Sequence, residues 1–266
     1  MLLAIYFLII LGFIVYSART LKGIPKLKLV EKLKEYPKVS IIIPARNEAD
    51  TIEWCLDSVT KLDYPRKEII VVDGNSTDGT YKIAKKYKGI KVFREGKLPK
   101  GWIGKNWACW LGYKKASGEY LLFTDGDTWH HPKLLISSIA YMQKNRVDFL
   151  TLGQKAVMRS FWEKVSLPVI FFIIMLNNGG KRINDDKSKD LVVNGMYILV
   201  KRKAYEKVGG HESVKDNIVE DFFLGKRFKS MGFRLRFLAA MDYFETKMYK
   251  NFSEMFEGWT KNFFAF

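Results

Sequence analysis

The chain has 266 residues, enough for one large hydrophobic core or two modest ones, and 15% of them are aromatic. Its two cysteines, Cys55 and Cys109, lie far apart and in no metal-ligand spacing, which argues against a disulfide framework and a zinc site. The formal net charge of +17 suits nucleic acid, anionic lipid or a phosphorylated substrate as a partner.

The first 16 residues are almost continuously apolar, with Gly12 as the main interruption. As a helix they would be roughly 24 Å long, close to the hydrocarbon thickness of a bilayer. Basic residues follow this run and do not precede it, which favours a retained anchor over a secretory signal peptide. We therefore expect residues 1–18 to be a single-pass membrane anchor, with the rest of the chain on the cytoplasmic side.

Residues 19–38 form a basic linker that contains six lysines between Lys22 and Lys38. Such a charge run is often simply solvated. Beside a membrane anchor, it should also attract an anionic membrane surface.

Short apolar segments alternate with helical patterns over the first half of the remaining chain. Strands are expected at residues 39–44, 68–73, 91–93 and 120–124. Helices are expected after a capping box formed by Asp50 and Glu53, after the loop at 74–80, and over residues 107–116. This alternation predicts an α/β fold with a largely parallel sheet.

Acidic residues follow two of these strands. Asp73 ends one strand, while Asp125 and Asp127 follow another with Gly126 between them. Open α/β sheets bind ligands at the carboxyl ends of their strands. Two neighbouring carboxylates repel each other unless a hard divalent cation holds them, although the same three residues are also common in turns.

The second half of the chain is less regular. Residues 161–176 contain a ten-residue apolar run, too short to span a bilayer, which suits either a buried core helix or an interfacial segment. A polar loop is expected at 178–189, strands at 191–200 and 234–238, and a helix at 217–230. The aromatic residues 253–266 predict an amphipathic end that lies on a membrane or packs in the core.

Four segments together resemble glycosyltransferase family 2. They are IPARNE at 43–48, VDGNSTDGT at 72–80, FTDGD at 123–127 and VED at 219–221. The resemblance covers residues 39–266 and implies a GT-A fold, a Rossmann-like mixed sheet flanked by helices. It also implies a nucleotide-sugar-binding half at 39–150 and an acceptor-binding half at 151–266. GWIGKNWA at 101–108 and NGMYIL at 194–199 further resemble the subgroup that glycosylates isoprenoid lipids such as hopanoids and carotenoids.

The resemblance implies a binding site for a UDP- or GDP-linked sugar. Its nucleotide-sugar contacts would be Pro44, Arg46, Glu48, Asp73, Lys105 and Asp125. Loop capping remains an alternative role for Asp73, and simple solvation for Lys105. Asp78 is better explained as a helix N-cap. The family often has a second acid after the strand-end aspartate, where this chain has Gly74.

The resemblance also implies the catalytic groups. Asp125 and Asp127 would bind Mg²⁺ or Mn²⁺ through the diphosphate of the donor. Transfer with inversion needs a carboxylate that accepts the proton of the acceptor hydroxyl. By the resemblance, Glu220 and Asp221 are the catalytic acids, and Asp221 is the base. Asn217 and Glu220 also have the spacing of a capping box, which would leave Asp221 free to face the cleft. A first-turn acid stabilised by the helix dipole is an alternative role for Asp221.

These features predict a membrane-anchored, metal-dependent inverting glycosyltransferase with a lipid or lipid-phosphate acceptor. A polysaccharide-type glycosyltransferase is the nearest alternative, but GWTKN at 258–262 stands where such enzymes carry Q-x-x-R-W. A non-catalytic, membrane-tethered nucleotide-binding protein is a second alternative. A nucleic-acid partner is disfavoured because acids at strand ends repel phosphate.

Overall fold

The computed structural model describes residues 12, 15, 23–177, 180–249 and 251–264. The expected anchor at 1–18 therefore lies outside the described residues, apart from Gly12 and Val15. Within the described ranges, no helix is both long and apolar enough to cross a membrane.

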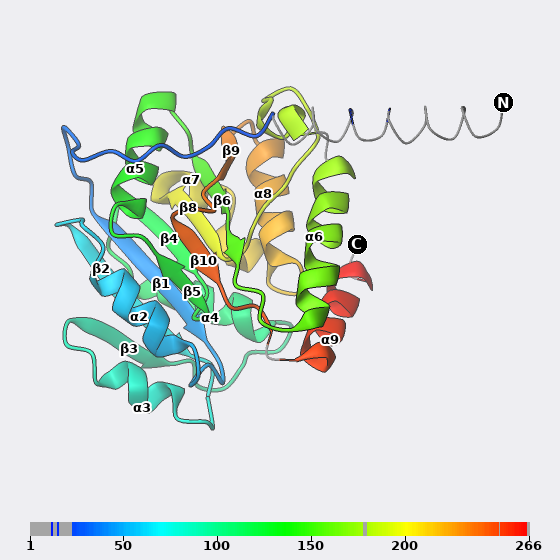
Figure 1. The fold of residues 1–266 in the computed structure, drawn as a ribbon. Coiled ribbons are helices and arrows are strands. Elements are labelled where there is room, and N and C mark those ends of the chain that lie inside the picture. Colours follow the sequence, from blue (N-terminus) through cyan, green and yellow to red (C-terminus); the bar gives the residue numbers. More distant parts are fainter. Residues whose placement is uncertain (1–11, 13–14, 16–22, 178–179, 250, 265–266) are drawn as a thin grey trace.

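A seven-stranded mixed sheet forms the centre of the molecule (Figure 1). Its strands in spatial order are β3 (Ile90–Arg94), β2 (Lys67–Asp73), β1 (Val39–Ala45), β4 (Tyr120–Thr124), β8 (Tyr197–Lys201), β6 (Phe149–Gly153) and β9 (Leu235–Ala239). The pairs β3–β2, β2–β1, β1–β4 and β6–β9 are parallel, whereas β8 is antiparallel to β4 and β6. The mixed sheet is confirmed, and it joins both expected halves of the chain.

The central strands form because their apolar runs are buried on both faces. All five residues of β4 are buried, and Ile41 to Ile43 of β1 have no exposed surface. Strands of this composition sit stably only in the middle of a sheet that helices cover on both sides.

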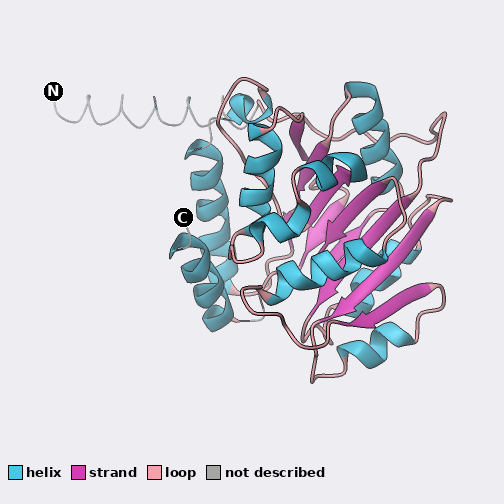
Figure 2. Ribbon diagram, turned by 180° about the vertical axis from the view of Figure 1, so that it is seen from behind, coloured by secondary structure: helices cyan, strands magenta, loops and turns pink. Residues whose placement is uncertain are grey.

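Helices cover both faces of this sheet (Figure 2). One core face is built with α2 (Ile52–Thr60), α3 (Thr80–Lys85) and α5 (Leu134–Asn145). The other is built with α4 (Gly104–Lys115), α7 (Arg202–Lys207) and α8 (Glu220–Ser230). A second sheet has the order β5 (Thr128–His130), β10 (Phe244–Thr246), β7 (Lys155–Ala156), and short 3₁₀ helices lie at Gly180–Asn184 and Gly210–Val214.

Two helices, α6 (Phe161–Asn177) and α9 (Phe252–Phe264), lie side by side at one flank of the molecule (Figure 1). Trp162 and Phe252 have ring centroids 5.0 Å apart, and Phe171 and Trp259 have centroids 6.1 Å apart. The prediction of a buried core helix at 161–176 holds for one side of α6 only: Leu167 is buried, whereas Val165 and Val169 are about half exposed.

Several element boundaries differ from those expected. The N-cap of α2 is Thr51 and not Asp50, and the N-cap of α8 is Val219 and not Asn217. Neither of the two expected capping boxes therefore forms. The strand expected at 191–200 is reduced to β8. The helix α5 and the strand β6 were not expected at all.

Candidate active site

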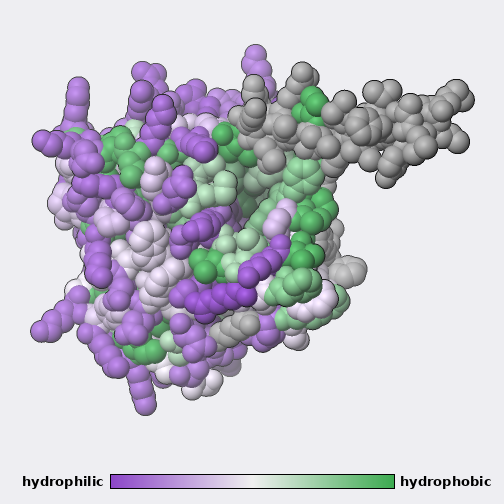
Figure 3. Space-filling view, viewed as in Figure 1, coloured by the Kyte–Doolittle hydropathy of each residue, from purple (hydrophilic) through white to green (hydrophobic). Residues whose placement is uncertain are grey.

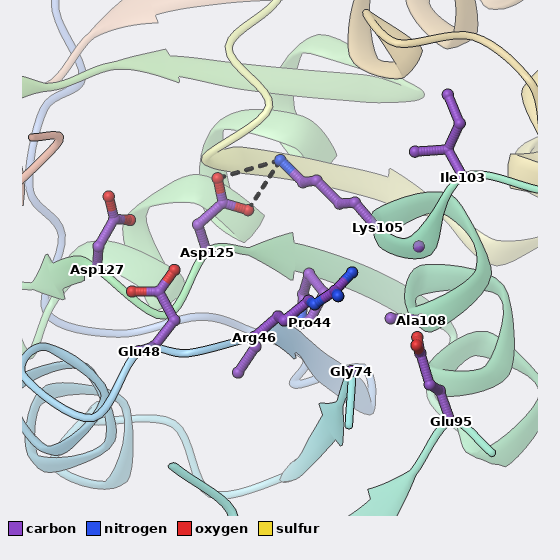
Figure 4. A pocket seen from close by; sticks show the side chains of 12 residues that line it. Pro44, Arg46, Glu48, Gly74, Glu95, Ile103, Lys105, Ala108, Asp125 and Asp127 are labelled. Carbon is purple, nitrogen blue, oxygen red and sulfur yellow. Dashed lines mark hydrogen bonds and ion pairs between the residues drawn. The ribbon is translucent and has the colours of Figure 1, made fainter. Parts of the chain in front are cut away.

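A cleft of about 320 Å³ opens at the carboxyl ends of β1, β2 and β4 (Figure 4). Its lining comes from the ends of β1 to β4 and from the first turns of α4: Pro44, Ala45, Arg46, Glu48, Gly74, Glu95, Ile103, Gly104, Lys105, Ala108, Asp125 and Asp127. Six of the predicted site residues, Pro44, Arg46, Glu48, Lys105, Asp125 and Asp127, therefore share one cavity. Its volume is in the range of small-molecule sites.

Reciprocal hydrogen bonds hold the loops after β1 and β2 together. The backbone N–H of Asn47 donates to Ser76 Oγ (3.0 Å), and Asn47 Oδ1 accepts from the N–H of Thr77 (3.0 Å). Asp78 accepts from the N–H groups of Ala49 (2.9 Å) and Thr80 (3.0 Å). Gly79, and not Asp78, is the N-cap of α3, so the predicted N-cap role of Asp78 is wrong. Asp78 instead holds the two loops together through these hydrogen bonds, and it does not line the cleft.

Gly74 follows the strand-end Asp73, and its neighbours leave little room for a side chain. A Cβ atom at Gly74 would lie 3.2 Å from Cβ of Arg46. The missing side chain leaves room for Arg46 to lie along the wall of the cleft (Figure 4).

Carboxylates of Glu48, Asp125 and Asp127 gather at one end of the cleft (Figure 4). Asp127 Oδ2 accepts from the hydroxyl of Thr246 (3.3 Å), whereas its Oδ1 is buried without a hydrogen-bond partner. Burial, followed by the charges of Asp125 and Glu48, raises the pKa of Asp127 well above its ordinary value. An extra positive charge at this end of the cleft would relieve that repulsion.

Lys105 joins this end of the cleft to the start of α8. Its Nζ lies 3.0 Å from Asp125 Oδ1 and 3.3 Å from Glu220 Oε1. Burial alone would lower the pKa of Lys105, but the carboxylates of Asp125 and Glu220 outweigh it and hold the pKa well above its ordinary value. One ammonium group thus balances acids from two separate segments of the chain.

Asp221 lies next to this cluster in the first turn of α8. Its Oδ1 accepts from the N–H of Phe222 (2.8 Å), and Gly195 is so close that a Cβ there would lie 3.0 Å from Asp221 Oδ2. Burial and then the charge of Glu220 raise the pKa of Asp221 to about 7, against a lowering by Lys105. A carboxylate with such a pKa can accept a proton near neutral pH.

Buried acids lie at the opposite end of the cleft. Asp73 is fully buried at the end of β2 beside Gly74, accepts from the N–H of Ser76 (3.2 Å) and lies 3.5 Å from Arg94 Nε. Asp73 Oδ1 and Glu95 Oε2 are both buried and lack hydrogen-bond partners. Hydroxyl or N–H groups of a ligand would satisfy these acceptors.

Some of the predicted site residues line the cleft, and the others lie directly behind its wall. Asp73, Glu220 and Asp221 are not among the residues that line the cleft, but each lies beside one that is, through Gly74 or Lys105. Sequence reasoning missed Glu95, which follows β3 as the other acids follow their strands. Because β3 was expected to end at Phe93 and extends to Arg94, the strand-end position of Glu95 was not apparent.

The donor set for a metal consists of few protein groups. Among the described residues, no group of three or more His, Cys, Asp or Glu side chains has the arrangement of a metal site. Asp125 and Asp127 nevertheless suit Mg²⁺ or Mn²⁺, ions that one or two carboxylates bind together with phosphate oxygens of a substrate. The unpartnered Oδ1 of Asp127 fits that use.

The chain is similar to proteins named 4,4'-diaponeurosporenoate glycosyltransferase. It is 27% identical over 259 residues to a 4,4'-diaponeurosporenoate glycosyltransferase from Staphylococcus haemolyticus, covering 96% of this chain and 68% of that protein. A protein of the same name from Staphylococcus aureus is 26% identical over 227 residues, covering 84% of this chain and 60% of its own length. The chain thus spans about two thirds of the length of these relatives.

Solved structures share the fold at lower identity. A mannosyltransferase from Pyrobaculum calidifontis in complex with GDP-Man and Mn²⁺ has a TM-score of 0.59 at 19% identity, covering 90% of this chain and 65% of its own. TarS 1-349 from S. aureus, in complex with UDP-GlcNAc, has a TM-score of 0.58 at 21% identity, covering 82% of this chain and 60% of its own. A GT-A-like mixed α/β fold is therefore shared with nucleotide-sugar enzymes.

The family model Glycosyl transferase family 2 matches residues 40–209. That range includes β2 to β8, all of β1 except Val39, and all the residues that line the cleft. The chain belongs to glycosyl transferase family 2.

Proposed function

We propose that this protein is a membrane-associated, metal-dependent inverting glycosyltransferase that moves a sugar from a nucleoside-diphosphate donor to an isoprenoid-type lipid. The observation that carries the proposal is the pair of salt bridges that Lys105 makes with Asp125, two residues before Asp127 in the sequence, and with Glu220, next to Asp221. Glycosyl transfer needs both: a place for the leaving diphosphate and a base for the acceptor.

At the nucleoside end, Asp73 and Glu95 have buried carboxylate oxygens that could accept hydrogen bonds from a nucleoside. Asp73 Oδ1 and Glu95 Oε2 would accept from hydroxyl groups of the ribose and N–H groups of the base. Arg46 and the backbone around Pro44 and Gly74 would form the wall against which the nucleoside lies. UDP- and GDP-linked sugars both present such donors.

At the diphosphate end, Asp125 and Asp127 would hold Mg²⁺ or Mn²⁺, which when bound neutralises the charge that develops on the leaving nucleoside diphosphate. Lys105 would move from Asp125 towards a phosphate oxygen, because a diphosphate carries more negative charge than a single carboxylate. Glu48 extends the same acidic wall and would help to orient the sugar hydroxyls.

Asp221 is the proposed general base. It would accept the proton of the acceptor hydroxyl as that oxygen attacks the anomeric carbon, so that one displacement inverts the configuration. Glu220 would stay ion-paired with Lys105 and hold the base near its neutral-range pKa. Glu220 is thus a positioning residue in this scheme.

Two further observations support the acceptor class and the location. The relatives in Staphylococcus are named for a carotenoid substrate, and the chain begins with an apolar stretch followed by the basic linker. We propose that residues 1–18 anchor the protein in a membrane with the catalytic domain on the cytoplasmic side.

Calorimetry tests the metal assignment directly. With Mn²⁺ present, Asp127→Ala should lose binding of UDP and GDP, whereas Asp242→Ala, at an exposed acid outside the cleft, should bind as the wild type does. Unchanged affinity in Asp127→Ala would contradict the assignment. A screen of UDP- and GDP-sugars against lipid extract, followed by mass spectrometry, would then identify donor and product, and the absence of any glycosylated lipid would refute the acceptor class.

A further inference from the structure

Four exposed aromatic side chains form a continuous row across α6 and α9. Phe161, Trp162, Phe252 and Phe256 are 69%, 49%, 46% and 64% exposed. Successive ring centroids along the row are 5.4, 5.0 and 6.1 Å apart. This aromatic row therefore bridges two helices and faces solvent.

An apolar stripe continues the row along α6. Val165, Val169 and Ile173 are exposed by 50%, 54% and 45% and follow Phe161 at intervals of four residues. At about 3.6 residues per turn, this spacing keeps them on one side of the helix over roughly 18 Å. Lys164 is the only charged residue among the described α6 positions that are exposed. Figure 3 shows apolar surface gathered over α6.

Ile24, near the start of the continuously described range 23–177, lies close to the C-terminal end of α6. Ile24 packs in one cluster with Ile174 and Met175 of α6. Six peptide units separate residue 18 from residue 24, so the apolar N-terminal stretch ends within roughly 21 Å of that cluster. Lys26 and Lys28 are exposed just beyond it. Apolar surface and exposed lysines next to a hydrophobic stretch match the chemistry of an anionic bilayer surface.

The same helices adjoin the acidic end of the cleft. The N–H of Lys247 donates to the backbone oxygen of Asp127 (3.0 Å), and α9 begins only five residues later at Phe252. Tyr249, between them, packs so closely on Gly258 of α9 that a Cβ there would lie 3.0 Å from Tyr249 Cε1. A surface that receives α6 and α9 would thus also lie beside the proposed reaction centre.

We infer that the aromatic row and the apolar stripe insert among the headgroups of an anionic lipid bilayer. This contact rests on the proposed function, because it presents the acidic end of the cleft to an acceptor that emerges from the membrane. It is separate from the N-terminal stretch. An anchor fixes the distance of a domain from the bilayer, whereas a second apolar contact fixes which side of the domain faces it.

Lipid quenching of a site-specific fluorophore tests this orientation in the full chain. Cys55 and Cys109 are both buried, so a single introduced cysteine can be labelled selectively with an environment-sensitive dye. Val169→Cys carries the dye on the stripe, and Lys82→Cys carries it at an exposed position on α3. Vesicles contain phosphatidylcholine and phosphatidylglycerol with spin-labelled lipid, and binding of UDP or GDP checks that each variant is folded.

Strong quenching at Val169→Cys with little at Lys82→Cys is the expected result. Equal quenching at the two positions would overturn the inference. So would a shift in dye emission that rises with protein concentration without lipid quenching, because a second copy of the chain would then cover the stripe.

A triple variant, Trp162→Gln with Val165→Gln and Val169→Gln, gives an independent readout. Transfer to lipid in vesicles should fall several-fold, while hydrolysis of the donor in detergent stays unchanged. Unchanged transfer in vesicles would also count against the inference. Quenching without any lipid glycosylation would leave the membrane contact standing and refute the proposed acceptor, whereas glycosylation without quenching would do the reverse.

Discussion

Replacing the proposed base should make the protein more stable while it stops sugar transfer. The fold raises the pKa of Asp221 from an ordinary 3.8 to about 7. Between these two values the unfolded chain has released its proton and the native chain has not, so the free energy of unfolding falls as the pH rises. Three pKa units correspond to at most about 4 kcal/mol, fully lost above the native pKa.

Asp221→Asn removes this penalty, because an amide does not ionise. Its Oδ1 can still accept from the N–H of Phe222, whereas its amide NH₂ fits poorly beside the backbone N–H of Gly195. We therefore expect the free energy of unfolding of Asp221→Asn to exceed that of the wild type by about 2 kcal/mol near pH 8. Near pH 5 the difference should be smaller or absent. Urea unfolding at both pH values measures the difference, and transfer to lipid measures the loss of activity.

Asp216→Asn is the matched control, since Asp216 is an exposed acid four residues before the start of α8. Its unfolding free energy should differ from the wild type by the same small amount at both pH values. The reasoning would be refuted if Asp221→Asn gained equally at both, or if it transferred sugar at the wild-type rate.

Two other substitutions test the electrostatics of the site and the packing of the sheet. Lys105→Met removes the cation that lowers the pKa of Asp221, so the rising limb of kcat/KM against pH should move to higher pH. Lys115→Met, at the exposed end of α4, is the control. An unmoved limb in Lys105→Met, or the same shift in Lys115→Met, would contradict this role of Lys105. Gly112→Ala puts a Cβ atom 2.4 Å from Ile42 Cγ2 in the buried sheet, and should cost about 1–3 kcal/mol in urea unfolding, with wild-type stability as the contradicting result.

The strands of the first half could be predicted because their apolar runs need burial on both faces. Residues 39–44, 68–73 and 120–124 were placed within one residue of β1, β2 and β4. Their acids could be placed as well, since parallel strands bring their carboxyl ends to one edge. The two capping boxes failed because their spacing depends on only two residues each, and neighbouring contacts outweighed them. Glu220, for example, pairs with Lys105 instead.

The second half was harder because its pairings are distant in sequence. The antiparallel position of β8 between β4 and β6 depends on partners 47 to 81 residues away, which local periodicity does not reveal. The helix α6 is apolar almost all round, so its sequence could not indicate which side is exposed. The bridge through Lys105 is also a long-range fact, since it joins residues more than 100 positions apart.

The hydrogen bonds that hold the loops after β1 and β2 have a consequence for the order of folding. They close loops of about 30 residues, whereas β4 and β8 pair across roughly 80. Closing the longer loop costs only about 0.9 kcal/mol more in conformational free energy. The pairing of β4 with β8 cannot form, however, until the residues between them have been synthesised. We expect the nucleoside end of the cleft to form first during synthesis, and the segment that carries Asp221 to join after it. A chain caught between these stages would hold a nucleotide without the base, and would be unable to use the sugar.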